Sequence, residues 1–348
     1  MIYGRTINNN DDKITYKKEN IYKNKEFIYK QVDDNKLKAY YFKDILGKYD
    51  SIPQHTIVKL WLSHKKENNN IWIPLTNSPK WTGGQSEIFI LYKIINDKRY
   101  DFECAIAKNF KDDDNFILEN RIFNIIQKKS EKFGKDIYEK YIPKKYGTTN
   151  AFVNNEKKKF LVIEYIDGIT LSKLINSKNI SENMVKIIFS QLCEVIGFFH
   201  SIGLSHRDLK PQNIMVTGDK DDNGNYIENS IQIKLIDFGL SYYSRKKRKC
   251  FDSVGTINYC APEIFSDSEE GYDSYKSDLW SLGIILFSMV NYHSPYITPV
   301  ENNDMFLDFI NKERYDNNDK INYIIKSLCN INPDERISCE NIIEILRD

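Results

Sequence analysis

The sequence of 348 residues lacks a strong net charge, paired cysteines and any long apolar run. Lysine plus arginine number 50 and aspartate plus glutamate 49, so no global field draws the chain to nucleic acid or to a membrane surface. The six cysteines are scattered without a CxxC pair, which favours reduced thiols in a cytoplasmic compartment over disulfides or zinc. The longest apolar run, Trp280–Val290, is too short to span a bilayer and predicts a buried core helix. The N-terminus shows no signal-peptide pattern.

The hydrophobic pattern of the sequence changes along the chain, from one typical of strands to one typical of helices. Residues 1–79 predict an N-terminal extension of unassigned role, with strands at 56–62 and 71–75 joined by a polar turn. Residues 80–166 predict a small β-rich lobe, and 167–348 a larger helical one, so the expected fold is α+β. Strands are expected at 87–94, 100–108 and 158–166, and helices at 115–129, 181–203, 278–291, 303–313, 319–329 and 338–347.

Two local signals are sharper than the rest. Ser181 and Gly203 are typical of the two ends of a helix, and the polar insertion 217–230 contains an Asn-Gly turn expected at the tip of a hairpin. For the helix at 115–129, Asp113 or Asp114 is the expected cap.

The stretch "HRDLKPQN" (206–213) crowds three different polar groups into one turn with apolar flanks. The carboxylate of Asp208 can accept a hydroxyl proton, and the ammonium of Lys210 can neutralise a transferring phosphoryl group. The amide oxygen of Asn213 can hold a hydrated Mg²⁺. Phosphoryl transfer needs this combination, because its catalysis is mostly positioning and charge stabilisation.

This stretch resembles the catalytic loop of the eukaryotic protein kinase family, H-R-D-L-x-x-x-N. The resemblance implies a bilobal kinase fold, ATP and Mg²⁺ as cofactors, and protein serine or threonine hydroxyls as substrates. It implies that Asp208 orients and deprotonates the hydroxyl, that Lys210 contacts the γ-phosphate and that Asn213 binds metal. "IKLIDFGLS" (233–241) resembles the D-F-G segment, which implies that Asp237 is the main Mg²⁺ ligand and that Asn213 binds the second metal.

Further matches imply structural roles in the larger lobe. "GTINYCAPE" (255–263) resembles the end of an activation segment, in which Thr256 is expected to bond Asp208 and Lys210. Glu263 is expected to be buried against Arg336, and Asp278 is expected to hold the catalytic loop through backbone hydrogen bonds. Asp252 is expected to stand in for a phosphate near Arg207, and Ser253 is the competing phosphorylation site.

In the smaller lobe, "CAIAK" (104–108) resembles the strand whose lysine binds the α- and β-phosphates, which implies this role for Lys108 and a nucleotide contact for Ala105. Glu119 is the expected ion-pair partner of Lys108, sharing a helix face with Ile122 and Phe123. "WTGGQSEIF" (81–89) departs from the family's glycine-rich loop, with Trp81 and Ser86 at two of the glycine positions. The residues implied to contact nucleotide are Gly83, Gly84, Ser86, Ile88, Ala105, Lys108, Glu164 and Ile166, the last two through the backbone.

The leading hypothesis is therefore a serine/threonine protein kinase with no nucleic-acid or membrane partner. The departures in the glycine loop keep open a pseudokinase or scaffold, and a small-molecule kinase of related fold is the third alternative. The sequence does not assign an oligomeric state, a physiological substrate or a role for residues 1–79.

Overall fold

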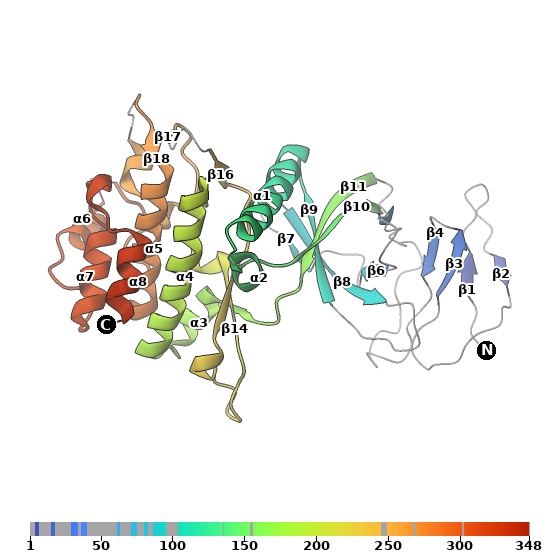
Figure 1. Cartoon of the computed structure of the whole chain (residues 1–348), viewed down its shortest axis with the longest axis horizontal. Helices are drawn as coiled ribbons and strands as arrows, with labels where there is room; N and C mark the ends of the chain where they lie inside the picture. The colour runs from blue at the N-terminus through green and yellow to red at the C-terminus, as the bar shows by residue number, and fades with distance from the viewer. Residues whose placement is uncertain are drawn as a thin grey trace. The chain divides into compact units, whose positions relative to one another are not determined.

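The computed structural model describes residues 4–6, 15–17, 29–33, 36–39, 61–62, 71–74, 80–82, 86–94, 104–134, 136–153, 156–244, 249–266, 269–300 and 303–347. The chain divides into two compact units. The first contains residues 1–116 and 145–165, and the second contains residues 117–144 and 166–348. The first is built from strands and the second mostly from helices, which confirms the predicted α+β class (Figure 1).

The first unit is built on an antiparallel sheet of seven strands. Its strands, in spatial order, are β5 (Trp61–Leu62), β10 (Lys145–Val153), β11 (Glu156–Glu164), β9 (Cys104–Phe110), β8 (Ser86–Ile94) and β6 (Ile71–Pro74), with β7 (Trp81–Thr82) also paired to β8. Strands β5 and β6 fall inside the range predicted as an extension, yet they form opposite edges of this sheet. Two separate hairpins precede them, β1 (Gly4–Thr6) with β2 (Thr15–Lys17) and β3 (Tyr29–Asp33) with β4 (Lys36–Ala39).

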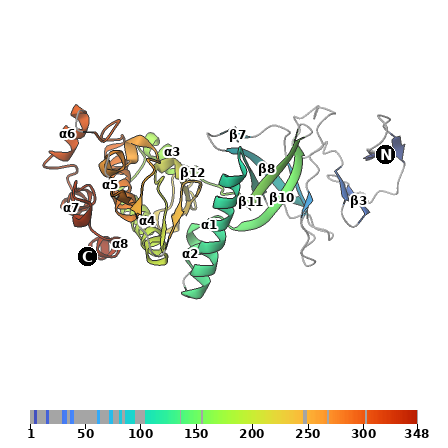
Figure 2. The ribbon, with the colours of Figure 1, turned by 90° about the horizontal axis from the view of Figure 1, so that it is seen from above.

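The second unit gathers helices around two long central ones, as both views of the ribbon show (Figures 1 and 2). The α-helices among the described residues are α1 (Asp113–Lys132), α2 (Ile137–Tyr141), α3 (Leu171–Ser177), α4 (Glu182–Ile202), α5 (Ser274–Asn291), α6 (Asp304–Ile310), α7 (Asp319–Leu328) and α8 (Cys339–Arg347). Helix α4 packs on α5 and α8, and α5 also packs on α7. The core lies where these helices meet, and Trp280 is its largest fully buried side chain.

Helix α4 shows how local chemistry sets a helix. Ser181 accepts a hydrogen bond from the Met184 amide, and Gly203 ends the helix in the left-handed region at φ 92°. Both ends were predicted. By length and composition α4 alone, in the part of the chain that is described, could cross a membrane, but 56% of that window is buried inside the protein. The apolar residues of α4 therefore belong to a core helix of the second unit.

Short strand pairs carry the loops of the second unit. Strand β14 (Ile214–Thr217) pairs with β12 (Ile169–Thr170) and with β15 (Gln232–Leu235), and the polar insertion between β14 and β15 forms the predicted hairpin tip. The other pairs are β13 (Leu204–Ser205) with β16 (Tyr242–Tyr243) and β17 (Lys249–Cys250) with β18 (Tyr272–Asp273). These pairs frame the turn in which the predicted catalytic residues lie.

Candidate active site

The turn after β13 is held by one buried carboxylate from helix α5. Asp278 accepts hydrogen bonds from the backbone amides of His206 and Arg207, both at 2.8 Å, as the sequence predicted. Arg207 sits in the left-handed region at φ 65°, a conformation that costs free energy for a residue with a β-carbon. The two charge-assisted bonds to Asp278 offset that cost and fix the start of the catalytic turn.

Asp208 is the centre of a cluster of polar side chains. Its Oδ2 lies 2.8 Å from Lys210 Nζ and accepts from Asn213 Nδ2 at 3.1 Å, and its Oδ1 accepts from the Thr256 hydroxyl at 2.7 Å. The Lys210 ammonium also donates to the Thr256 hydroxyl, at 2.7 Å. The bonds expected of Thr256 are therefore confirmed, and three of the predicted site residues are brought into direct contact.

Asn213 and Asp237 lie at the ends of paired strands. Ile214 and Leu235 are partners in the β14–β15 register, and the Ile236 amide donates to the Asn213 carbonyl at 2.9 Å. Asn213 thus accepts this backbone hydrogen bond, and Asp237 follows the residue that donates it. The backbone of Asp237 turns sharply at φ 69°, and the Gly239 amide donates to its carboxylate at 3.3 Å.

Aromatic packing fixes the residue after Asp237. Phe238 is fully buried, and its ring lies 5.1 Å from that of Phe123 on α1, 5.6 Å from that of His206 and 6.2 Å from that of Phe199 on α4. Burial lowers the pKa of His206, so this ring is favoured in its neutral form. Phe238 thereby links helix α1 to the catalytic turn.

Arg207 binds the activation segment through Asp252. Its two terminal nitrogens donate to the two oxygens of Asp252 at 2.9 and 2.7 Å, and its Nε donates to the Leu240 carbonyl at 2.9 Å. The hydrogen bonds from Arg207 hold the pKa of the Asp252 carboxyl below its usual range. The expected contact between Asp252 and Arg207 is therefore confirmed. Sequence reasoning missed Tyr272, whose hydroxyl donates to the Asp252 carbonyl at 3.0 Å.

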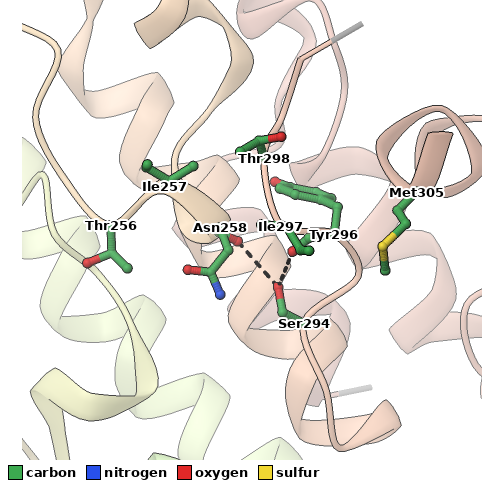
Figure 3. Close-up of a pocket in the computed structure, with 8 residues that line it drawn as sticks. All are labelled: Thr256, Ile257, Asn258, Ser294, Tyr296, Ile297, Thr298 and Met305. Atoms are coloured by element: carbon green, nitrogen blue, oxygen red, sulfur yellow. Dashed lines mark hydrogen bonds between the residues drawn. The ribbon is translucent and has the colours of Figure 1, made fainter. Parts of the chain in front are cut away.

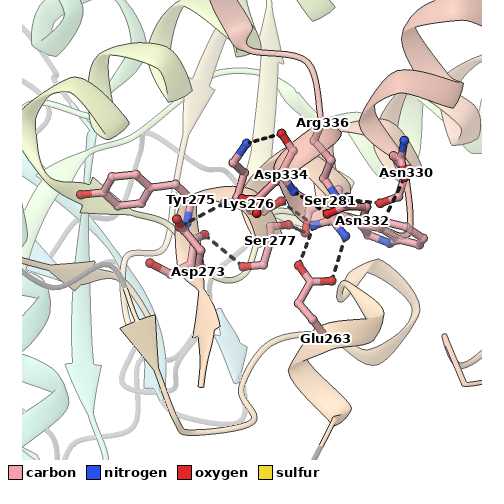
Figure 4. A network of polar contacts seen from close by, with 12 residues as sticks. Glu263, Asp273, Tyr275, Lys276, Ser277, Ser281, Asn330, Asn332, Asp334 and Arg336 are labelled. Atoms are coloured by element: carbon pink, nitrogen blue, oxygen red, sulfur yellow. Dashed lines mark hydrogen bonds and ion pairs between the residues drawn. The ribbon is translucent and has the colours of Figure 1, made fainter. Parts of the chain in front are cut away.

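The predicted pair of Glu263 and Arg336 forms with fork geometry (Figure 4). Arg336 Nη1 and Nη2 donate to the two Glu263 oxygens at 2.6 and 2.8 Å. The buried partner is the arginine, because its side chain is 0% exposed and that of Glu263 is 16% exposed. The expectation of a buried glutamate is corrected accordingly. Arg336 also donates to the carbonyls of Asn330 and Lys276.

In the first unit, Lys108 is buried on the central strand β9. It is paired with Ile88 on β8 and with Leu161 on β11, and its ammonium lies 5.1 Å from the centre of the Phe110 ring. Paired residues of neighbouring strands share a face, so Ile88 and Lys108 lie on the same side of the sheet. Ser86 is also on this side, since it pairs with Phe110.

Ala105 lies on the opposite face, which corrects its expected place beside Lys108. It is fully buried and pairs with Glu164 on β11. Side chains alternate along a strand, so the residue two positions before Lys108 shares its face, and that residue is Ile106. Counting this alternation in the sequence would have found Ile106.

The remaining predicted residues are placed less completely. Gly83 and Gly84 lie outside the described residues. Glu164 is half-buried and Ile166 is buried, in the first and second unit respectively. Glu119 is 1% exposed on the buried face of α1 with Ile122 and Phe123. Glu119 and Lys108 belong to different units, and their ion pair stays a prediction.

The start of α1 differs by one residue from the expected cap. Asp112, and neither Asp113 nor Asp114, accepts from the Asn115 amide at 2.8 Å. A carboxylate three residues before that amide is the usual capping geometry. The early cap is what lets the helix begin directly after β9.

Comparison with known proteins gives one family model and several curated relatives. Residues 137–345 match a family model described as a protein kinase domain, a range that begins after Lys108 and Glu119. CBL-interacting protein kinase 9 from Oryza sativa is 36% identical over 149 residues, which is 42% of this chain and 30% of that protein. CBL-interacting serine/threonine-protein kinase 18 from Arabidopsis thaliana is 31% identical over 195 residues, or 54% of this chain and 35% of that protein.

A fungal relative is also similar to the chain. Serine/threonine-protein kinase CHK1 from Saccharomyces cerevisiae is 34% identical over 160 residues, which is 44% of this chain and 28% of that protein. The matched segments thus span about a third of the length of these curated relatives.

Proposed function

Because the chain belongs to the protein kinase family, we propose that it transfers the γ-phosphoryl group of Mg-ATP to serine or threonine hydroxyls of proteins. The observation that carries this proposal is the cluster around Asp208, in which Lys210, Asn213 and Thr256 all bond one carboxylate. Relatives named as serine/threonine kinases support the same hydroxyl acceptor.

Asp208 is the base in the proposed reaction. The hydroxyl oxygen of the substrate attacks the γ-phosphorus, and the bond from that phosphorus to the oxygen bridging it to the β-phosphate breaks. ADP leaves with the electron pair of that bond, and the hydroxyl proton passes to the Asp208 carboxylate. A carboxylate offers about four lone-pair directions, so Asp208 can accept this proton donor besides its three neighbours. Lys210 and Thr256 hold the carboxylate in place and balance its charge.

The donor set fits Mg²⁺ held with help from phosphates. Among the described residues no group of three or more histidine, cysteine or acidic side chains could hold a metal alone. Mg²⁺ is commonly bound by one or two carboxylates together with substrate phosphates and water. The Asn213 side-chain nitrogen donates to Asp208, which leaves its amide oxygen for a cation. Asp237 follows Ile236, whose amide bonds the Asn213 carbonyl, so Asp237 is the second proposed ligand. Mg²⁺ there would neutralise charge on the phosphates.

In the smaller unit, the face of the sheet that carries Lys108 is proposed to receive the nucleotide. Ile88 and Ile106 flank the lysine there and supply apolar surface, and the lysine supplies the charge that α- and β-phosphates need. The pairing of Lys108 with Glu119, which is buried on α1, is part of the same proposal.

The test uses the purified full chain with Mg²⁺ and γ-labelled ATP, assayed for autophosphorylation and for transfer to a serine/threonine peptide library. We expect label on serine or threonine, lost in Asp208→Asn and kept in Asp222→Asn, a matched change at the exposed hairpin tip. A chain that binds Mg-ATP in calorimetry without any turnover would overturn the proposal in favour of a pseudokinase or scaffold. Label on small alcohols but not on peptides would favour a small-molecule kinase.

A cytoplasmic location with protein substrates, and without nucleic-acid or membrane partners, is part of the same proposal. The free thiols of Cys193, Cys250, Cys260, Cys329 and Cys339 support a reducing compartment. Microscopy of the tagged full chain in its own cell type would test this, and a secreted or membrane-bound signal would contradict it.

A further inference from the structure

The polar insertion 217–230 forms a hairpin whose base is bound to the rest of the second unit. The Glu228 carboxylate accepts hydrogen bonds from the Ser181 hydroxyl and, at 2.6 Å, from the Asn183 side-chain nitrogen. Both donors lie at the start of helix α4, a core helix, so the base of the hairpin is tied to a rigid part of the fold. The chemistry proposed above uses none of the side chains of this insertion.

Tyr226 is the residue through which the hairpin contacts strands β12 and β14. Its side chain is half-buried, and the ammonium of Lys220, its partner across the hairpin, lies 5.1 Å from the centre of its ring. Its hydroxyl donates to the Val216 carbonyl, on β14, at 3.2 Å. Burial raises the pKa of this hydroxyl, the Asp167 carboxylate raises it further, and a backbone hydrogen bond with Ile169, on β12, acts in the opposite direction. The hydroxyl therefore contacts both of the paired strands.

The backbone that Tyr226 contacts comes directly after a residue implied to bind nucleotide. Ile166, whose backbone is expected to make that contact, lies three residues before Ile169, which pairs with Val216 in the β12–β14 register. Between them, a β-carbon on Gly168 would overlap the Val216 carbonyl oxygen, so the backbone packs directly on β14. Three residues span at most about 11 Å, so a shift of β12 is passed on to Ile166 over a short stretch of chain.

We propose that Tyr226 is a positioning residue for nucleotide binding, through which the hairpin fixes the backbone between Ile166 and β12. The proposal rests on the proposed kinase function, because it concerns the affinity for Mg-ATP. The hydroxyl acts through the backbone and is not a catalytic group. Its effect is expected on nucleotide affinity alone, because the catalytic turn is held by other groups, Asp278 and Thr256.

The surface beside the acceptor hydroxyl is built from other segments of the chain. Thr256, whose hydroxyl donates to Asp208 at 2.7 Å, borders a pocket of about 500 Å³ (Figure 3). The other residues that line this pocket are Ile257, Asn258, Ser294, Tyr296, Ile297, Thr298 and Met305. None of them belongs to the insertion, so the KM for a peptide substrate is an internal control for changes in the hairpin.

The test replaces Tyr226 with phenylalanine in the full chain, which removes the hydroxyl and keeps the ring. Calorimetry gives the Kd for a non-hydrolysable ATP analogue with Mg²⁺, and steady-state assays with a serine peptide give kcat and both KM values. We expect Tyr226→Phe to raise the Kd for the analogue and the KM for ATP about fivefold, the effect of about one neutral hydrogen bond. The values of kcat and of the peptide KM should stay unchanged.

Two measurements guard against a merely structural role. Tyr323→Phe, at an exposed tyrosine on α7, is the matched control and should behave as the wild type in every assay. Urea unfolding of both variants gives their free energies of unfolding. A hydroxyl that only stabilises the fold would lower the free energy of unfolding in Tyr226→Phe and leave the nucleotide affinity of the folded chain unchanged.

The outcomes separate this inference from the function on which it rests. Unchanged analogue affinity in Tyr226→Phe overturns the positioning role and keeps the kinase, and a lowered kcat or a raised peptide KM also overturns that role. Weaker analogue binding in Tyr226→Phe, with a wild-type chain that transfers no phosphoryl group, overturns the kinase and keeps the positioning role. A wild-type chain that binds no adenine nucleotide overturns both.

Discussion

Replacing Glu263 with alanine removes the carboxylate that faces a fully buried guanidinium. Two charge-assisted hydrogen bonds, at 2.6 and 2.8 Å, are lost. Bonds of this kind contribute about 1.5–3 kcal/mol each. Breaking one side of a buried pair costs about 3–5 kcal/mol. Arg336 keeps its bonds to the Asn330 and Lys276 carbonyls, so we expect the lower end of that range, a loss of about 3 kcal/mol in the free energy of unfolding.

The measurement is urea unfolding followed by tryptophan fluorescence, for which Trp280 is well placed. Its ring lies 5.0 Å from the Arg336 guanidinium carbon. The double variant Glu263→Ala with Arg336→Met removes the stranded charge, so the two changes together should cost less than their sum by at least about 1.5 kcal/mol. The exposed pair of Arg314 and Asp319, with nitrogen and oxygen 2.9 Å apart, is the control and should show a coupling below about 0.5 kcal/mol.

Two results would refute this reasoning. A cost of Glu263→Ala below about 1 kcal/mol would show that the buried guanidinium finds other partners. If the double variant loses the sum of the two single losses in free energy of unfolding, within about 0.5 kcal/mol, the interaction between Glu263 and Arg336 does not contribute to stability.

Three further predictions concern the catalytic turn and its surroundings. Asp278→Ala removes the acceptor of two backbone amides at 2.8 Å, so it should lower the free energy of unfolding by about 3 kcal/mol and abolish transfer; a stable and active variant would contradict this. Hydrogen bonds from Arg207 hold the pKa of Asp252 below its ordinary value of about 3.9, so the stabilisation is complete above that value and is lost only as pH falls through the lower native pKa. Asp252→Ala should therefore lower turnover and the free energy of unfolding equally at about pH 5 and about pH 8. An unchanged turnover rate would count against this prediction, and so would a difference in stability between wild type and variant that is present at one of these pH values and absent at the other. Burial raises the pKa of Cys260 to about 12, so iodoacetamide should label this thiol at neutral pH only after urea is added, as peptide mass spectrometry would show.

The sequence predicted those features of the fold that depend on residues close together in the chain, such as helix ends. Ser181 and Gly203 mark the ends of helix α4, because a capping hydroxyl and a left-handed glycine act within one turn of the chain. The strand β10 was missed, because its sequence mixes lysine, glycine, threonine and asparagine. It becomes a strand through pairing with β11, which follows it along the chain, and with β5, which is distant in the sequence. The sequence predicted that β5 and β6 are joined by one turn, but tertiary pairing places them at opposite edges of the sheet.

In the candidate site too, contacts between residues close in the sequence were predictable from their spacing, and contacts between distant residues were not. Asp208, Lys210 and Asn213 come together because they lie in one short turn, so their spacing alone predicts the cluster. Glu263 and Arg336 are 73 residues apart, and only the resemblance to a family pointed to their contact. Ala105 was expected to contact the nucleotide from its place in the motif, whereas the alternation of side chains along β9 decides which residues share a face with Lys108.

The hairpin tip between β14 and β15 has a practical consequence for experiments in solution. Its Asn-Gly turn is exposed, Gly224 has open space around it, and the base of the insertion is tied to helix α4 by a bond from Asn183 to Glu228 at 2.6 Å. The thiols of Cys193, Cys250, Cys260, Cys329 and Cys339 are all buried. A cysteine introduced at Asp222 would thus offer an accessible attachment point for a fluorophore, at a rigidly anchored position that leaves the catalytic turn untouched.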